Sequence, residues 1–119
     1  MFQQVLLESK LVAILRLDSL DQAPRIVETL LDAGVRCIEF TLTNRKAPEW
    51  VSRLVSELPS FRTGHAFLGM GSVRNLEEAK MVLGSGAQFV VTPIMQPEVI
   101  RCCVEAKIPI ACGAYTPTE

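Results

Sequence analysis

The feature that most constrains this chain is a repeated alternation of short apolar runs with segments of helical periodicity. The runs are apolar at consecutive positions, which is typical of parallel strands covered on both faces. Each run is joined to the next by a segment long enough for one helix, and this order predicts an α/β fold with a parallel sheet. The five apolar runs span residues 11–15, 37–42, 66–68, 87–91 and 108–112.

Two architectures share this order of elements, an open doubly wound sheet and a closed (β/α)8 barrel. A doubly wound sheet that binds a dinucleotide carries Gly-x-Gly-x-x-Gly after its first strand, but Arg16, Leu17 and Asp18 follow the first run here. The sequence therefore favours a parallel (β/α) barrel of the TIM type, with about the first five strands and four helices of eight. A chain of 119 residues also fits a single domain, residues 1–119, because domains commonly hold about 100–150 residues.

Residues that cap helices mark where the four helices begin and end. Ser19 and Gln22 have the spacing of a capping box, in which the two residues satisfy each other's free backbone N–H groups. They predict a first helix that starts behind Ser19 and runs to Ala33, where Gly34 can end it. The other helices are predicted over residues 47–58, over residues 76–84 behind an Asn75 cap, and from Pro97 onward.

Composition excludes several classes of function. Twelve Lys and Arg residues against thirteen Asp and Glu give a net charge of −1, so there is no basic excess for nucleic acid or an anionic membrane. The longest apolar runs hold about five residues, whereas a membrane-spanning helix needs about 20. The first residues also lack the basic and long apolar segments of a signal peptide. We expect a cytoplasmic protein with no nucleic-acid partner and no membrane segment.

The residues that commonly bind metals are few and poorly spaced. The chain has four cysteines and one histidine, His65, without a Cys-x-x-Cys pair or a His pair at ligand spacing. We therefore expect no metal site, and reduced cysteines that serve as small packing residues.

Polar residues at the carboxyl ends of the predicted strands are the candidates for chemistry, because reactive groups of parallel barrels gather there. Glu39 interrupts an otherwise apolar strand, and a buried carboxylate either pairs with a cation or takes a raised pKa. A raised pKa would suit Glu39 to move protons near neutral pH. Arg16 ends its own strand, and it either binds a substrate carboxylate or phosphate or forms a structural ion pair with Glu39 or Asp18.

The loops that follow the second and third strands supply further candidates. Arg45 is either a substrate contact or a solvated surface residue. Residues 69–72, Gly-Met-Gly-Ser, are predicted to form a turn in which two glycines allow a ligand close to the backbone and Ser72 presents a hydroxyl.

Five phrases of the sequence, taken in order, resemble the 2-keto-3-deoxy-6-phosphogluconate and 4-hydroxy-2-oxoglutarate aldolase family, and together they cover essentially the whole chain. The resemblance implies a (β/α)8 barrel, a homotrimer, and a lyase that cleaves a 2-keto-4-hydroxy acid to pyruvate and an aldehyde. It implies no metal or other cofactor, since a lysine forms a Schiff base with the ketone. The phrases are residues 12–16, 34–42, 69–73, 86–93 and 116–119.

The resemblance also implies roles for single residues. Glu39 matches the glutamate that carries the proton, Ser72 stands where the family usually has a threonine that contacts pyruvate, and Pro93 matches a proline that lines the pocket. Thr43 stands where the family often has the arginine that holds the pyruvate carboxylate. Thr43 is itself a candidate substrate contact, and Arg16 and Arg45 are two possible donors to the carboxylate.

The family's lysine lies on a sixth strand, and the sequence ends after the fifth. None of the four lysines, Lys10, Lys46, Lys80 and Lys107, falls inside a predicted strand. We therefore expect the 119-residue chain alone to be inactive as an aldolase. Two alternatives stay open, a non-catalytic barrel fragment that acts as an oligomeric or regulatory module, and another phosphate-handling barrel such as an isomerase or epimerase. The sequence does not choose between a phosphorylated sugar acid and 4-hydroxy-2-oxoglutarate as substrate.

Overall fold

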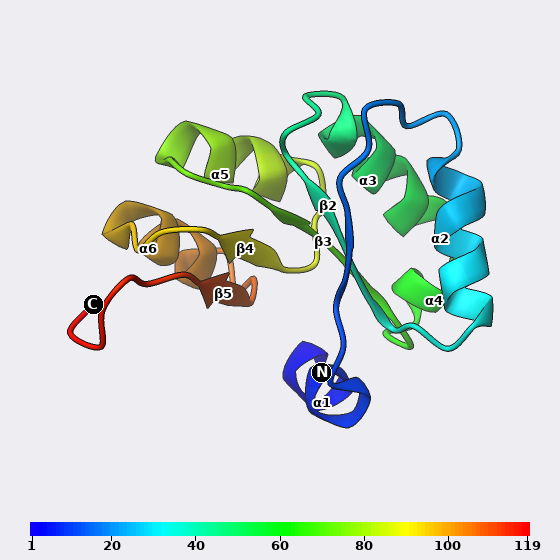
Figure 1. Ribbon diagram of the computed structural model, residues 1–119, viewed down its shortest axis with the longest axis horizontal. Helices are drawn as coiled ribbons and strands as arrows, with labels where there is room; N and C mark the ends of the chain where they lie inside the picture. Colours follow the sequence, from blue (N-terminus) through cyan, green and yellow to red (C-terminus); the bar gives the residue numbers. More distant parts are fainter.

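A five-stranded parallel sheet organises the chain, as seen in a computed structural model that describes residues 1–119 (Figure 1). Every strand is parallel to its neighbours, and the order in the sheet is the order in the chain. The strands are β1 (Ala13–Leu15), β2 (Cys37–Thr41), β3 (Phe67–Gly71), β4 (Val90–Thr92) and β5 (Ile110–Cys112). The helices are α1 (Phe2–Ser9), α2 (Ala23–Asp32), α3 (Ala47–Glu57), α4 (Pro59–Arg62), α5 (Leu76–Gly84) and α6 (Pro97–Glu105).

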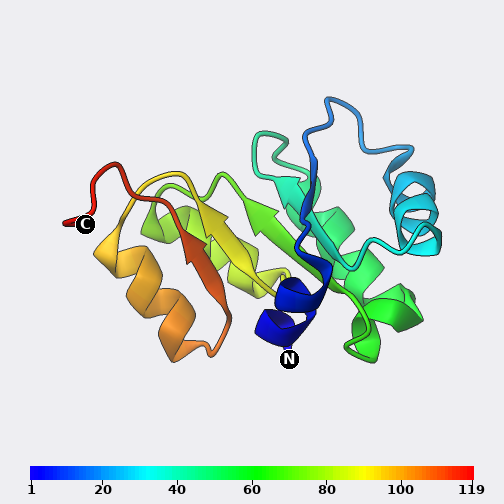
Figure 2. The ribbon, with the colours of Figure 1, turned by 60° about the horizontal axis from the view of Figure 1, so that its bottom comes forward.

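The strand order confirms the predicted barrel-type fold. A doubly wound sheet reverses direction at a switch point, so its strands do not follow one another in sequence order. Here each connection moves the chain one strand further in the same direction, as in the wall of a (β/α)8 barrel. All carboxyl ends of the strands therefore lie along one rim, and α1 lies at the opposite end (Figure 2).

The main core lies between the sheet and the helices α2 to α6. Side chains alternate between the two faces of a strand, so Ile38 and Phe40 of β2 and Leu68 and Met70 of β3 share one face and are fully buried there. The helices place their own apolar side chains against this face, namely Val27, Val51, Leu54, Phe61, Val82 and Val99. None of the helices is both long enough and apolar enough to cross a membrane.

A smaller core on the other, concave face was not predicted, because α1 precedes the first apolar run and has only two buried residues, Phe2 and Val5. The Phe2 ring stacks on Phe89 at 4.4 Å between centroids and meets the edge of Phe67 at 5.6 Å. These rings and Val5 pack against Cys37 at the start of β2. The N-terminal end of the concave face is therefore covered, while Ile14 of β1 remains 59% exposed.

The predicted start of the first interstrand helix is wrong. α2 begins at Ala23, and its N-cap residue is Gln22 without a side-chain cap. The Ser19 hydroxyl instead accepts a hydrogen bond from the Asp21 N–H within a turn. Burial of Leu20, which is 5% exposed, explains the difference, because it holds residues 19–22 in a turn before the helix can start. The Asn75 cap is confirmed, since its side chain accepts the Glu78 N–H at 2.8 Å.

The predicted turn at residues 69–72 is also wrong for its first three residues. β3 continues through Gly71, with Gly69 opposite Glu39 and Gly71 opposite Thr41 in the register. The two glycines accommodate neighbours instead of turning the chain. A Cβ at Gly69 would lie 2.5 Å from the Phe89 carbonyl oxygen, and one at Gly71 would overlap the Glu39 carboxylate.

The remaining differences concern element ends and two additional helices. β1, β4 and β5 begin two or three residues later than their apolar runs. The predicted second interstrand helix ends one residue early at Glu57, and the one-turn helix α4 follows it because Pro59 starts a new turn.

Candidate functional site

Glu39 lies in the middle of β2 on the concave face and is 4% exposed. The same alternation that buries Ile38 and Phe40 under the helices directs Glu39 to the opposite side of the strand. Its carboxylate extends over Gly71, whose missing side chain provides the space. Burial raises the pKa of Glu39, and the nearby charge of Arg16 offsets only part of this rise.

The Glu39 carboxylate has no partner in the protein. It forms no hydrogen bond to another side chain and no ion pair with any Lys, Arg or His, while every fully buried polar side-chain atom of the molecule does have a partner. The Glu39 oxygens therefore keep some contact with solvent on the concave face. A carboxylate that is desolvated, unpaired and still reachable can exchange a proton with a bound molecule.

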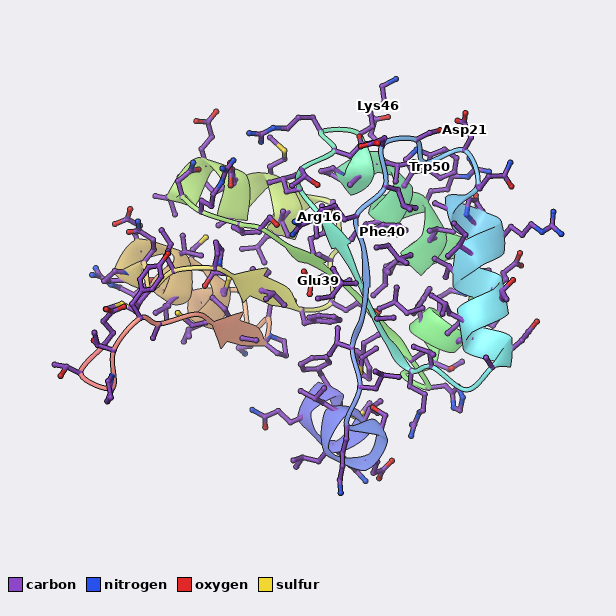
Figure 3. The ribbon with its side chains drawn as sticks, viewed as in Figure 1. Arg16, Asp21, Glu39, Phe40, Lys46 and Trp50 are labelled. Atoms are coloured by element: carbon purple, nitrogen blue, oxygen red, sulfur yellow. The ribbon has the colours of Figure 1, made fainter.

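Arg16 follows the last residue of β1 at the rim that bears the carboxyl ends of the strands. Leu15 pairs with Phe40 in the register, so Arg16 comes level with the end of β2, on the Glu39 side of the strand (Figure 3). The structural ion pair considered from the sequence, to Glu39 or Asp18, is absent. The guanidinium of Arg16 is exposed and free to bind an anion.

A polar cleft of about 370 Å³ lies between the loop after β1 and the loop after β2. Asn44, which was not among the predicted site residues, ties the two loops together by donating to the carbonyls of Leu17 at 3.2 Å and Asp18 at 3.0 Å. The Thr43 hydroxyl pairs with the Thr41 hydroxyl at 2.7 Å. The cleft is lined by Arg16, Leu17, Asp18, Thr43, Asn44 and Arg45.

Arg45, unlike Arg16, forms an ion pair within the protein. Its Nη2 lies 3.3 Å from Oε1 of Glu78 on α5, and Arg74 makes a second ion pair of the same length to that oxygen. Burial by itself would raise the pKa of Glu78, but the hydrogen bonds from Arg74 and the charges of Arg74 and Arg45 outweigh it and lower the pKa. Nothing in the sequence singled out Glu78 beyond its place in the first turn of a helix.

Ser72 and Pro93 come directly after the ends of β3 and β4, at the same rim as Arg16. Ser72 is half-buried and has a φ of 59°, in the left-handed region. Pro93 is exposed, and its carbonyl lies so close to Gly113, the residue after β5, that a Cβ there would lie 2.5 Å from the Pro93 oxygen. The predicted site residues thus follow the carboxyl ends of β1 to β4 along one rim, and Glu39 lies within β2 on the adjoining concave face. Arg16 is the one of them whose charge acts on Glu39.

Neither the lysines nor the largest cavity lies beside Glu39 on the concave face. No strand contains a lysine, and all four lysine side chains are exposed. Lys46, at the start of α3, points away from the sheet (Figure 3). The largest cavity, about 640 Å³, lies at the opposite end of the sheet beside α1, and Lys107 is the one charged side chain in its lining. No three His, Cys, Asp or Glu side chains are grouped as a metal site.

Comparison with known proteins shows that the chain is similar to aldolases. A family model described as KDPG and KHG aldolase matches residues 2–119. The 2-dehydro-3-deoxy-phosphogluconate aldolase of Haemophilus influenzae is 30% identical over 110 residues, which are 92% of this chain and 50% of that protein. The chain spans about half the length of the curated relatives it matches.

Solved structures of aldolases also match this chain. A 4-hydroxy-2-oxoglutarate and 2-dehydro-3-deoxyphosphogluconate aldolase is 32% identical with a TM-score of 0.81, over 98% of this chain and 55% of that one. A KDPG aldolase from Legionella pneumophila, solved with pyruvate captured as a covalent carbinolamine intermediate, has a TM-score of 0.81 over 96% of this chain and 53% of its own. At 21% identity, the Legionella structure shows the shared fold alone.

Proposed function

The chain belongs to the KDPG and KHG aldolase family of lyases, and from this premise we propose that it forms the first β/α units of a class I aldolase site. The reaction proposed is the retro-aldol cleavage of a 2-keto-4-hydroxy acid to pyruvate and an aldehyde. The observation that carries the proposal is Glu39, a buried carboxylate without a partner, facing the concave side of a barrel-type sheet. Its lysine partner in the reaction would come from barrel units beyond these residues.

Glu39 is proposed to act as the general base and then as the general acid. As base it takes the proton of the C4 hydroxyl, so that the C3–C4 bond breaks and the aldehyde leaves. The electron pair of that bond moves into the Schiff base of the ketone and leaves an enamine, and the protonated Glu39 is then able to return a proton to its C3. Water would then hydrolyse the resulting Schiff base to release pyruvate and the lysine amine. A pKa raised by burial supports this cycle, because a proton carrier works best when its pKa lies near the working pH.

Arg16 is proposed to hold the substrate carboxylate. A free guanidinium can bind a carboxylate through two parallel hydrogen bonds, and Arg16 is free whereas Arg45 is paired with Glu78. Thr43 carries no charge and is satisfied by Thr41. Ser72 is proposed to contact the pyruvate part of the substrate, and Pro93 to line its pocket.

Two broader properties of the family are proposed with the activity. Residues 1–119 would form part of one barrel domain in a cytoplasmic homotrimer. Light scattering on the full-length version, in which the remaining barrel units follow this chain, would measure a mass of three subunits. A monomer under all conditions would remove this part of the proposal.

Kinetics of the full-length version test the role of Glu39. Glu39→Gln keeps the shape of the side chain but cannot carry the proton, and we expect kcat for retro-aldol cleavage to fall by about 100-fold or more. Glu49→Gln, which changes an exposed residue at the start of α3, is the control and should match the parent. Unchanged turnover in Glu39→Gln would remove Glu39 from the mechanism. A parent protein without any cleavage of 2-keto-4-hydroxy acids would favour the non-catalytic alternative.

A further inference from the structure

A second buried glutamate, Glu78, joins the two loops that border the proposed site. Its side chain is 6% exposed and lies on the first turn of α5, where the Glu78 N–H donates to the Asn75 cap at 2.8 Å. Its carboxylate accepts three hydrogen bonds. The Arg74 N–H binds Oε2 at 2.9 Å, and the guanidinium groups of Arg74 and Arg45 both reach Oε1 at 3.3 Å.

The first connection fixes the backbone after β3. Ser72 has a φ of 59°. In this conformation the Cβ of an L-residue is crowded by the backbone, so the conformation persists only where the surroundings hold it. Val73 is fully buried and its N–H reaches the Val91 carbonyl at 3.4 Å, while the next N–H, that of Arg74, binds Glu78. The charge-assisted bond to Glu78 is the shorter of the two, so Glu78 provides the stronger anchor.

The second connection fixes the loop after β2. Arg45 lines the polar cleft together with Arg16 and Thr43, yet its guanidinium is held from the far side by Glu78 of α5. Two guanidinium groups share one carboxylate here, so the trio keeps one net positive charge at the rim. Without Glu78, Arg45 would be free to approach the anion-binding position that Arg16 occupies.

We propose that Glu78 is a positioning residue of the site. It holds Ser72 in its left-handed conformation and Arg45 at the border of the cleft, so that the loops after β2 and β3 keep a fixed separation. The kinetic consequence rests on the proposed aldolase function. The conformational consequence does not, because it follows from the contacts of Glu78 with Arg74 and Arg45 and from the positive φ of Ser72 alone.

Kinetics of the full-length version give the first test. Glu78→Gln keeps the size of the side chain but removes its charge, and we expect KM for the keto acid to rise about tenfold, as for the loss of one charge-assisted hydrogen bond. kcat should change less, because Glu39 is untouched. Glu77→Gln removes the neighbouring exposed charge from the same helical turn and should leave KM unchanged. Equal KM values for the two variants would overturn the kinetic part, since a purely structural defect lowers only the amount of active protein.

A rescue experiment tests the conformational part without any turnover. Glycine adopts a positive φ without an anchor, so Ser72→Gly should make the protein less dependent on Glu78. We expect Glu78→Gln to lower the midpoint of urea unfolding clearly in the Ser72 protein and much less in the Ser72→Gly protein, a coupling read by a double-mutant cycle. Equal losses in both backgrounds would show that Glu78 does not hold Ser72. If the parent had no aldolase activity, the proposed function would fail while this cycle still decided the role of Glu78.

Discussion

Gly71 offers the most direct test of how the site is built. The structure requires no side chain there, because a Cβ on Gly71 would overlap the Glu39 carboxylate and would lie 3.2 Å from Glu39 Cγ. The φ of Gly71 is not in the left-handed region, so alanine could adopt its backbone without strain. The whole effect of Gly71→Ala therefore comes from the contact between the new methyl group and Glu39.

The loss of stability depends on how the Glu39 side chain moves to avoid the new methyl group. Overpacking a filled region costs about 1–3 kcal/mol, and a side chain forced off its rotamer costs about 0.5–1.5 kcal/mol. We expect Gly71→Ala to lower the free energy of unfolding by about 2 kcal/mol. With a urea m-value of about 2 kcal/mol/M, the midpoint of unfolding falls by about 1 M.

The assay is urea unfolding of the full-length version, followed by circular dichroism. Gly84→Ala is the matched control, because a Cβ there meets nothing within 4 Å and the residue ends helix α5. We expect Gly84→Ala to be neutral or slightly stabilising. In a Glu39→Ala background the Gly71→Ala change should lose most of its cost, since the methyl group would fill vacated space. A Gly71→Ala protein as stable as the Gly84→Ala protein, or an equal cost in both backgrounds, would refute the reasoning.

Three further predictions concern charge, association and chemistry. Because burial raises the pKa of Glu39, its contribution to stability is fully present below the unfolded pKa near 4.5 and is lost as pH rises through the folded pKa. Glu39→Gln should therefore be more stable than the parent at pH 8 but not at pH 4, as measured by urea midpoints at the two pH values, and a constant difference would contradict the raised pKa. The 119-residue polypeptide on its own should form oligomers or aggregates at about micromolar concentration, because β1 and β5 have unpaired edges and Ile14 is exposed; a monomer with a cooperative melt, seen by light scattering and calorimetry, would contradict this. The same polypeptide treated with pyruvate and borohydride should give no stoichiometric adduct by mass spectrometry, because all four lysines are exposed and none lies in a strand that lines the concave face. A single adduct on Lys46 would overturn that expectation.

The fold could be predicted largely because parallel strands buried on both faces leave a strong signal. Runs such as residues 37–42 and 87–91 are too apolar and too short for anything else in a chain of alternating elements. The signal is weaker at the N-terminus, where α1 buries only Phe2 and Val5. Its packing partners, Phe67 and Phe89, lie more than 60 residues away in the sequence, and no local pattern reveals such a contact.

The candidate site, too, could be predicted from the sequence only in part. Glu39 could be found because a single charged residue in an apolar strand is conspicuous. The role of Gly71 could not, because a glycine that leaves room for a neighbouring strand looks the same in sequence as a glycine that turns the chain. Glu78 was missed for a related reason, since its partner Arg45 is 33 positions away and an acidic residue in the first turn of a helix needs no further explanation.

Glu39 and Glu78 show how the surroundings give one residue type two opposite properties. Both are 4% exposed, so burial alone would raise the pKa of each. Glu78 meets two guanidinium groups and a backbone N–H, and its pKa falls. Glu39 meets Gly71 and an arginine that stays at a distance, and its pKa rises. An Arg16 that closed on Glu39 would form a second Glu78-like pair and fix the carboxylate in its charged state. The separation between Arg16 and Glu39 therefore keeps the carboxylate able to accept and release a proton, and it leaves the guanidinium free for the anion that the proposed reaction must bind.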